Sequence, residues 1–293
     1  MLGLNGRCEH NPGPSIGITG EKLDNSISHP GPLPLLAEDE TPPFEIENPD
    51  GAAALVLVCD HARNTIPRSL CDLGLDSTVL GEHVALDIGC EMLARRLMYL
   101  LDGALILARY SRLVIDLNRH LADPASILSC SDRSIIPGNQ NLSAEQRLCR
   151  AEEVFVPYHN AVASQVEHVR VIHGVPVLIA LHSFTPELAG EPRPWEIGVL
   201  WTDDQRMSLP LLRSLRNDPN LCVGDNQPYD AREHVGYTIE THGGANGFPH
   251  VLIEIRQDLI ETEAGIMIWA DLLAEHLMPI LADDELYHRW DCD

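Results

Sequence analysis

From residue 53 onward, short apolar runs alternate with longer segments in which apolar residues recur at helical spacing. Short runs that are apolar throughout are typical of strands buried on both faces of a parallel sheet. We expect strands at residues 53–59, 103–110, 175–183, 196–201 and 250–260. We expect helices at residues 81–101, 143–172, 206–217 and 264–281. This alternation predicts an α/β fold whose largely parallel sheet is covered on both faces.

The signals at the ends of these segments define the domain organisation. Ser143 and Gln146 have the spacing of a capping box at the start of a helix, and Gly174 follows the end of the same segment. Residues 1–43 are rich in Pro, Gly, Asn and acidic residues and have no regular period. We therefore expect an irregular amino-terminal arm at 1–43 and a single α/β domain at 44–293.

The charge balance limits the choice of partner. The chain has 44 acidic residues against 20 Lys and Arg, of which only Lys22 is a lysine, and its formal net charge is −24. Nucleic-acid binding depends on neutralising phosphates with Lys and Arg, so a nucleic-acid partner is excluded. A few clustered arginines would instead bind a small acidic molecule. We see no membrane-spanning run or secretory signal and expect a cytoplasmic protein that does not bind membranes.

The eight cysteines are scattered and none lies in a Cys-x-x-Cys pair. This spacing indicates neither a zinc knuckle nor a redox pair, and it favours buried, reduced thiols. Cys59 is notable because it directly precedes the candidate site. The full set is Cys8, Cys59, Cys71, Cys90, Cys130, Cys149, Cys222 and Cys292.

Two expected strands end in histidine. "LVLVCDHARNTIP" places His61 just after the first strand, and "VLIALH" places His182 at the end of a later one. If the two strands are parallel neighbours, both imidazoles lie at the same edge of the sheet, where α/β proteins bind ligands. A single histidine at such a position is commonly structural. Two of them indicate a metal site with room for substrate.

A third ligand is available between these histidines. His83 and Asp87 are four residues apart in the expected helix 81–101, so both would lie on one helical face. Either side chain is a competent metal ligand. A set of imidazole and carboxylate groups suits zinc best.

Further polar side chains accompany the apolar runs. In "ARYSRLVIDLNRH", Arg119 is expected at a strand end, where it and Asn118 would bind a carboxylate, although these arginines could also stabilise an acidic surface. Glu254 lies inside an expected strand, where an ionised acid is costly without a partner. It would either pair with Arg256 or act as a general base.

Two loops offer additional contacts. His242 in "THGGANGFPH" would serve as a polar contact or proton donor, and Tyr229 in "GDNQPYD" would lie at the rim of a pocket. Both segments are equally compatible with simple turns. The chain contains neither a nucleotide-binding glycine fingerprint nor the Gly-x-Ser-x-Gly motif of serine hydrolases.

Seven motifs occur in an order that resembles the N-formylglutamate amidohydrolase family. They are "CDHARNTIP", "HVALDIG", "YSRLVIDLNR", "LHSFTP", "RPWEIGVLW", "DNQPYD" and "IEIRQDLI", and the resemblance extends from about residue 44 to 275. The resemblance implies the phosphorylase/hydrolase-like three-layer α/β/α fold, with a mostly parallel mixed sheet. Zinc carboxypeptidases and the succinylglutamate desuccinylase and aspartoacylase group share this fold.

The resemblance also implies roles for individual residues. His61 and His182 would bind one zinc ion per chain, Glu254 would activate water, and Asn118 with Arg119 would hold a substrate carboxylate. The related enzymes have an acidic ligand three positions after the first histidine, where this chain has Asn64. The third ligand is therefore expected to be Asp87 or, as the second choice, His83.

The implied reaction is hydrolysis of N-formyl-L-glutamate to formate and L-glutamate, a step of histidine catabolism. Arg112 or His242 would stabilise the negative charge on the acyl oxygen. The segments "CDHA" and "ALHS" differ from the "PHAG" and "DAHS" of characterised deformylases, which favours a sister branch. The alternatives are hydrolysis of another N-acyl amino acid or small peptide, and a metal-free module that binds a carboxylate. Self-association stays open.

Overall fold

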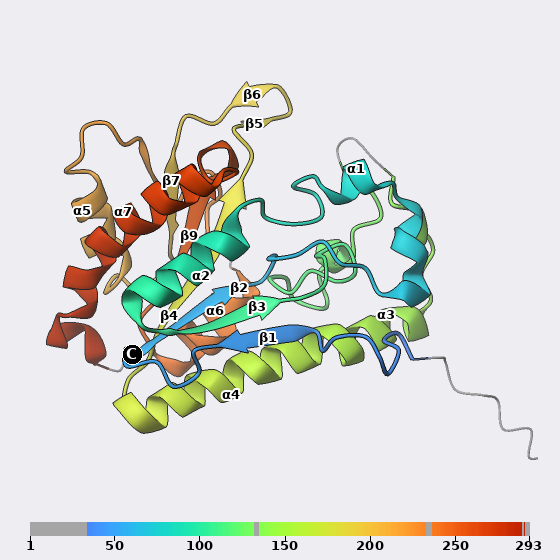
Figure 1. Cartoon of the computed structure of the whole chain (residues 1–293), viewed down its shortest axis with the longest axis horizontal. Coiled ribbons are helices and arrows are strands. Elements are labelled where there is room, and N and C mark those ends of the chain that lie inside the picture. Colours follow the sequence, from blue (N-terminus) through green and yellow to red (C-terminus); the bar gives the residue numbers. More distant parts are fainter. Residues whose placement is uncertain (1–33, 132–134, 233–235, 289, 291–293) are drawn as a thin grey trace, which may run out of the picture. The chain divides into compact units, whose positions relative to one another are not determined.

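Seven strands form one mixed sheet in the computed structural model, which describes residues 34–131, 135–232, 236–288 and 290 (Figure 1). Their order across the sheet is β1-β3-β2-β4-β9-β7-β8. The strands are β1 (Phe44–Glu47), β2 (Leu55–Cys59), β3 (Ala104–Ala108), β4 (Val177–Phe184), β7 (Ile197–Leu200), β8 (Val223–Asp225) and β9 (His250–Arg256). A separate hairpin pairs β5 (Glu187–Leu188) with β6 (Glu191–Pro192).

The four central strands β3, β2, β4 and β9 are parallel to one another. β1 pairs antiparallel with β3, and β7 pairs antiparallel with β9. The prediction of a mostly parallel mixed sheet is therefore confirmed. β1, β8 and the small hairpin were not predicted, because they are short and lack the continuous apolar runs of the central strands.

The expected long helices are present, with one exception at residues 81–89. The helices are α1 (Ser77–Leu80), α2 (Cys90–Leu101), α3 (Ala144–Arg150), α4 (Val156–His173), α5 (Ser208–Leu215), α6 (Tyr237–His242) and α7 (Glu263–Leu281). A π-helical segment, Ala151–Phe155, joins α3 to α4, so helical structure continues from residue 144 to 173. Both hydrogen bonds of the predicted capping box between Ser143 and Gln146 are present.

Helices cover both faces of the sheet. Leu55, Leu57 and Cys59 on β2 pack into a core with α2, α5 and α7. The alternate residues Val56 and Val58 pack into a second core, to which α4 and the π-helical segment before it contribute most of the helical side chains. Figure 1 shows α2 and α7 over one face and α4 along the other. The predicted three-layer α/β/α fold is confirmed.

The expected helix 81–101 is wrong over its first nine residues. α2 begins only at Cys90, and residues 81–89 form turns. Gly89 has a left-handed backbone conformation with φ 81°, and a Cβ atom there would lie 2.1 Å from the carbonyl oxygen of Ile260. The helix therefore cannot extend through Gly89 toward the amino terminus. His83 and Asp87 consequently do not share a helical face.

A second correction concerns residues 111–119, which follow β3. This segment contains turns and no helix or strand, so Arg119 is not at the end of a strand. Its apolar residues Leu113, Val114 and Ile115 are buried in the second core. These residues are apolar because the loop that contains them is buried, and not because they form a strand.

α7 is long and apolar enough to cross a membrane by length and composition alone. One side of this helix, including Trp269, Leu273 and Leu277, packs into the first core beside α2 and α5. Because one side of α7 is buried in the domain, its length and composition are weak evidence for a membrane span.

The described chain from Pro34 onward belongs to one compact unit. Most of the expected arm, residues 1–33, lies outside the described residues, and residues 34–43 have neither helix nor strand. The expected boundary between arm and domain therefore stays a prediction.

The six cysteines that the structure describes are all free. Cys59 and Cys90 are buried, Cys149 is half-buried, and Cys71, Cys130 and Cys222 are exposed. The expectation of buried thiols is thus wrong for these last three. Cys8 and Cys292 lie outside the described residues.

Candidate metal centre and active site

Three of the predicted metal ligands come together at the carboxyl edge of the sheet. One potential ligand atom each from His61, Asp87 and His182 lies within 4.8 Å of the other two, and all three residues are buried. Asp87 Oδ2 is 3.3 Å from His61 Nδ1 and 2.8 Å from His182 Nδ1. His61 follows β2 and His182 lies near the end of the parallel neighbour β4, so the sheet itself brings the two imidazoles together.

A turn, and not a helix, brings Asp87 to these histidines. The backbone N–H of Asp87 donates to the carbonyl of His61 at 2.9 Å, which joins the turn to the end of β2. Ser111 Oγ donates to the Ala85 carbonyl at 2.7 Å and holds the turn from the other side. Gly89 then allows the chain to enter α2. The sequence analysis expected a helix to carry Asp87 into the site, whereas a turn does so in the structure.

A buried carboxylate lies beside the second ring nitrogen of each histidine. His61 Nε2 lies 2.8 Å from Asp116 Oδ1, and His182 Nε2 lies 3.4 Å from Asp60 Oδ2. The hydrogen bond with Asp116 keeps the proton on Nε2 of His61 and orients that ring with Nδ1 toward a metal ion. Asp60 Oδ2 has no hydrogen-bond partner among the described residues and favours the same orientation of His182 through its charge. The sequence analysis missed both acids. Asp60 directly precedes His61, and Asp116 lies in the same motif as Asn118.

Asp60 is itself fixed by two hydroxyl groups. Its Oδ1 accepts hydrogen bonds from Tyr158 on α4 at 2.6 Å and from Thr238 on α6 at 2.9 Å. Burial raises the pKa of the Asp60 carboxyl, but the contact with His182 and the positive charge of both histidines lower it by more. Asp60 is therefore an ionised, rigidly held partner of His182.

Arg112 balances the negative charge around the cluster. Its Nη1 lies 3.3 Å from Asp87 Oδ1, and its Nη2 lies 3.1 Å from Asp116 Oδ2. Burial alone would raise the pKa values of these two carboxyls. The histidines lower both pKa values well below the ordinary range, and Arg112 adds to this effect at Asp116. Both acids are consequently ionised at neutral pH.

The donor set of this cluster fits a zinc ion. Two imidazole nitrogens and one carboxylate oxygen converge, and this combination with an open fourth position is typical of catalytic zinc. Asp87 lies in the cluster, whereas His83 is exposed and lines the mouth of the adjacent cavity. Asn64, at the position of the missing acid, instead donates to the Leu80 carbonyl at 2.7 Å.

Glu254 is placed beside the cluster by the sheet register. It lies on β9 directly opposite His182 on β4. The side chain is buried, and its Oε2 has no hydrogen-bond partner among the residues that the structure describes. Burial raises the pKa of Glu254 to about 7, and the negative charge of Asp87 contributes. Glu254 does not pair with Arg256, which instead binds Asp258. The position and free oxygen of Glu254 are those of a proton acceptor.

A cavity of about 950 Å³ lies next to the cluster. Three of the predicted substrate-binding residues line it: Arg112, Arg119 and Tyr229. Arg112 connects the cavity to the cluster, because it also contacts Asp87. Asn118 is not among the lining residues. Its Oδ1 accepts from the backbone N–H of Thr238 at 3.1 Å, and its Nδ2 lies 3.4 Å from His182 Nε2.

His242 lies apart from both the cluster and this cavity. Its Nε2 is 3.0 Å from Nδ1 of His159, and the two rings stack with their centroids 5.3 Å apart. Burial and the charge of His159 lower the pKa of His242 to about 4, so the ring is neutral at neutral pH. His242 instead lines a different surface pocket together with Arg170 and Phe248.

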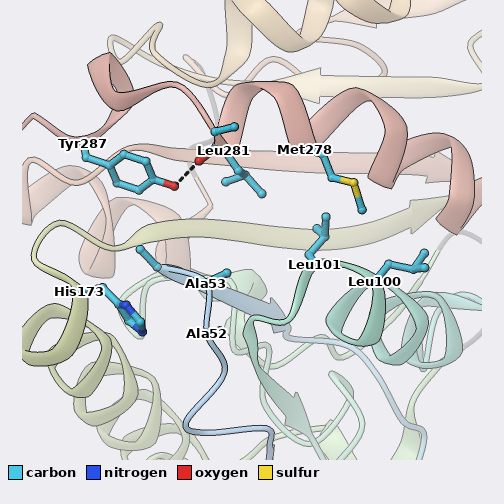
Figure 2. A pocket seen from close by; sticks show the side chains of 10 residues that line it. Ala52, Ala53, Leu100, Leu101, His173, Met278, Leu281 and Tyr287 are labelled. Atoms are coloured by element: carbon cyan, nitrogen blue, oxygen red, sulfur yellow. Dashed lines mark hydrogen bonds between the residues drawn. The ribbon is translucent and has the colours of Figure 1, made fainter.

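A further hollow of about 470 Å³ lies at the opposite edge of the sheet (Figure 2). It is lined by residues that precede β2, such as Ala53, and by apolar residues such as Leu101 and Met278. Its imidazole, His173, lies 3.3 Å from the Gly51 carbonyl. The residues that line this hollow include neither a carboxylate nor a second histidine, so it does not repeat the donor set of the metal cluster.

Comparison with known proteins connects this geometry to a family. The model of the N-formylglutamate amidohydrolase family matches residues 53–261, a range that contains the metal cluster and Glu254. The chain belongs to this family. The predicted resemblance is thereby confirmed, and the protein is assigned to a family of amidohydrolases. A comparison with curated proteins gives no match.

Two solved structures are similar in fold to this chain. A gene product of Agrobacterium tumefaciens is 33% identical, with a TM-score of 0.82, and the match covers 86% of this chain and 99% of that one. An N-formylglutamate amidohydrolase from Ralstonia eutropha is 20% identical, with a TM-score of 0.60 and coverage of 82% and 97%. The second structure shares the fold.

Proposed function

We propose that this chain is a zinc-dependent amidohydrolase that cleaves a small N-acyl amino acid, most simply N-formyl-L-glutamate, to formate and L-glutamate. The observation that carries this proposal is the buried cluster of His61, Asp87 and His182 next to the unpartnered carboxylate oxygen of Glu254. Family membership supports the reaction class. We place the reaction in the cytoplasm and expect neither a membrane nor a nucleic acid to take part.

The cluster would hold one zinc ion through His61, Asp87 and His182. A bound zinc ion would polarise the acyl oxygen and lower the pKa of water toward neutrality. Asp116 and Asp60 would keep the two imidazoles in the orientation that metal binding requires.

Glu254 would move the proton during hydrolysis. It would take a proton from water as the water oxygen forms a bond with the acyl carbon. Glu254 would then give this proton to the amine nitrogen as the carbon–nitrogen bond breaks. One N-acyl amino acid and one water molecule are consumed, and one carboxylic acid and one free amino acid are formed. Arg112, already beside Asp87, is placed to donate to the acyl oxygen.

Arg119 and Tyr229 would contact the substrate's carboxylates from the cavity wall. Arg119 is half-exposed there, and its guanidinium also pairs with Asp123 at 3.1 Å. We assign a positioning role to Asn118, because its carboxamide already bonds Thr238 and approaches His182. These contacts favour a small acidic substrate over a neutral one.

The proposal is tested by assaying formate release from N-formyl-L-glutamate with zinc-loaded protein and with protein stripped by a chelator. The proposal predicts turnover that is lost on stripping and restored by zinc. N-acetyl- and N-succinyl-L-glutamate and short peptides, assayed alongside, identify the preferred acyl group. Hydrolysis of another of these compounds would retain the enzyme class and replace the substrate. Binding of N-formyl-L-glutamate without hydrolysis of any compound would contradict the proposal and favour a carboxylate-binding module.

A further inference from the structure

Arg193 is a buried arginine without an acidic partner among the described residues. Only 8% of it is exposed, and its two hydrogen bonds go to hydroxyl groups: Nη1 lies 3.4 Å from Thr185 Oγ1 and 3.1 Å from Tyr229 Oη. Its Nε and Nη2 have no hydrogen-bond partner in the described parts of the chain. A buried cation without an anion is costly, and in a chain with 44 acidic residues it is unexpected.

Aromatic rings and the cavity wall surround this guanidinium. Its carbon lies 5.0 Å from the centre of the Tyr229 ring and 5.8 Å from that of Phe184. Both of its hydroxyl partners, Thr185 and Tyr229, line the cavity beside the metal cluster. The positive charge therefore lies directly behind one wall of that cavity.

The other arginines near the site already have acidic partners or a set of acceptors, although Arg112 and Arg119 also reach the cavity. Arg112 pairs with Asp87 and Asp116, and Arg119 pairs with Asp123 and Asp116. Arg150, which is also buried and has no acidic partner among the described residues, donates to the carbonyl oxygens of Val114 and Gly138 and to Asn139 Oδ1. Arg193 lacks such a set of acceptors, which points to a ligand that supplies the missing anion.

Tyr229 can pass this charge on to a ligand. Its hydroxyl oxygen accepts from Arg193, so its proton is free to be donated toward the cavity. Partial desolvation of the hydroxyl and the negative charge of Glu254 raise the pKa of Tyr229, which keeps that proton in place at neutral pH. A planar guanidinium beside a hydroxyl donor is well suited to a carboxylate.

We propose that Arg193 and Tyr229 form the subsite for the side-chain carboxylate of the substrate, so that Arg193 determines specificity for N-acyl derivatives of acidic amino acids. This inference rests on the proposed function. Thr185 follows the metal-cluster residue His182 by three residues, which is roughly 10 Å along an extended chain. That separation fits a carboxylate remote from the scissile amide. The α-carboxylate, near the amide, would be left to Arg119.

The test compares N-formyl-L-glutamate with N-formyl-L-glutamine, an isostere whose side chain is neutral, in wild type, Arg193→Met and Arg193→Lys. We expect Arg193→Met to lose about tenfold to a hundredfold in kcat/KM on the acidic substrate, mainly through KM, because the positive charge behind the Tyr229 hydroxyl is removed. In Arg193→Met, kcat/KM for N-formyl-L-glutamine should change less than about threefold. Arg193→Lys should recover part of the loss on N-formyl-L-glutamate. Arg213→Met, on the exposed side of α5, is the matched control.

Equal losses on both substrates, or an unchanged preference for the acidic one, would overturn the assignment. Calorimetric titration of zinc-loaded protein with L-glutamate and L-glutamine keeps the question separate from catalysis. Wild type should bind L-glutamate more tightly, and Arg193→Met should lose this difference while its thermal unfolding stays cooperative. If the protein hydrolyses no N-acyl amino acid, the proposed function fails, and the titration still decides the role of Arg193.

Discussion

His182 on β4 and Glu254 on β9 are direct register partners on two parallel strands. Directly opposed residues on neighbouring strands place their side chains on the same face of the sheet. The backbone ladder therefore positions the candidate proton acceptor next to a metal ligand without help from a loop. Burial of both side chains excludes bulk water from the space between them.

Replacing Glu254 by Gln should remove the proton acceptor while keeping the shape of the side chain. We expect kcat for N-formyl-L-glutamate to fall by about 10²-fold to 10⁴-fold, the usual contribution of a general base. Zinc content should not change, because Glu254 is not in the ligand cluster. Formate release and metal analysis measure the two quantities, and Glu261→Gln on the surface serves as the control. Wild-type kcat in Glu254→Gln would contradict its role.

Asp116→Asn should weaken zinc binding without removing a ligand. The carboxylate contacts His61 Nε2 at 2.8 Å, and loss of such an outer carboxylate typically lowers metal affinity by about 10-fold to 100-fold. Competition with a chromogenic chelator measures this affinity. Asp123→Asn, which removes the other acidic partner of Arg119, should leave zinc affinity unchanged. An equal effect of both substitutions would assign the loss to Arg119 and not to the orientation of His61.

Gly89→Ala should disturb the turn that carries Asp87. The left-handed backbone alone costs about 1–3 kcal/mol for a residue with a side chain. The new Cβ would also meet the Ile260 carbonyl oxygen at 2.1 Å. Urea unfolding and zinc content should therefore both decrease. Gly190→Ala is the matched control, because φ is 87° there but no atom lies within 4 Å of the added Cβ. Equal destabilisation by both substitutions would contradict this prediction, because it would show that the contact between the new Cβ and the Ile260 oxygen adds no cost.

His242 should make stability depend on pH without contributing to catalysis. Its pKa is lowered to about 4 in the folded protein, below about 6.5 in the unfolded chain. The unfolded state therefore binds more protons below pH 6.5, and stability falls as the pH decreases toward 4. At pH 5 this difference in pKa lowers the free energy of unfolding by about 2 kcal/mol relative to its value well above pH 6.5.

Urea unfolding of wild type and His242→Asn at pH 7.5 and pH 5 measures this contribution. The variant should lose less stability than wild type between the two pH values, and it should retain formate release at pH 7.5. Loss of activity in a folded variant would return His242 to the catalytic residues.

The strands that carry the site could be predicted because each has a strong local signal. β2, β4 and β9 are continuous apolar runs, so the positions of His61, His182 and Glu254 followed from strand boundaries alone. Which strands are neighbours is a property of the whole sheet. The pairing of His182 with Glu254 therefore could not be obtained from the spacing of residues in sequence.

The parts that could not be predicted depend on turns and on long-range contacts. The segment from His83 to Asp87 has a helical period, but the left-handed backbone of Gly89 separates it from α2. Asp60 and Asp116 gain their significance only from contacts with histidines distant in sequence. Arg193 could not be singled out in the sequence, because its lack of an acidic partner among the described residues is visible only in three dimensions.

The most direct test of the central claim is the zinc content of protein purified without chelator, for wild type, His61→Ala and His83→Ala. The two variants separate the buried cluster from the exposed histidine at the mouth of the cavity. We predict about one zinc per chain in wild type and His83→Ala, and loss of zinc together with formate release in His61→Ala. Full zinc content in His61→Ala, or wild-type protein that hydrolyses N-formyl-L-glutamate without any metal, would contradict the account.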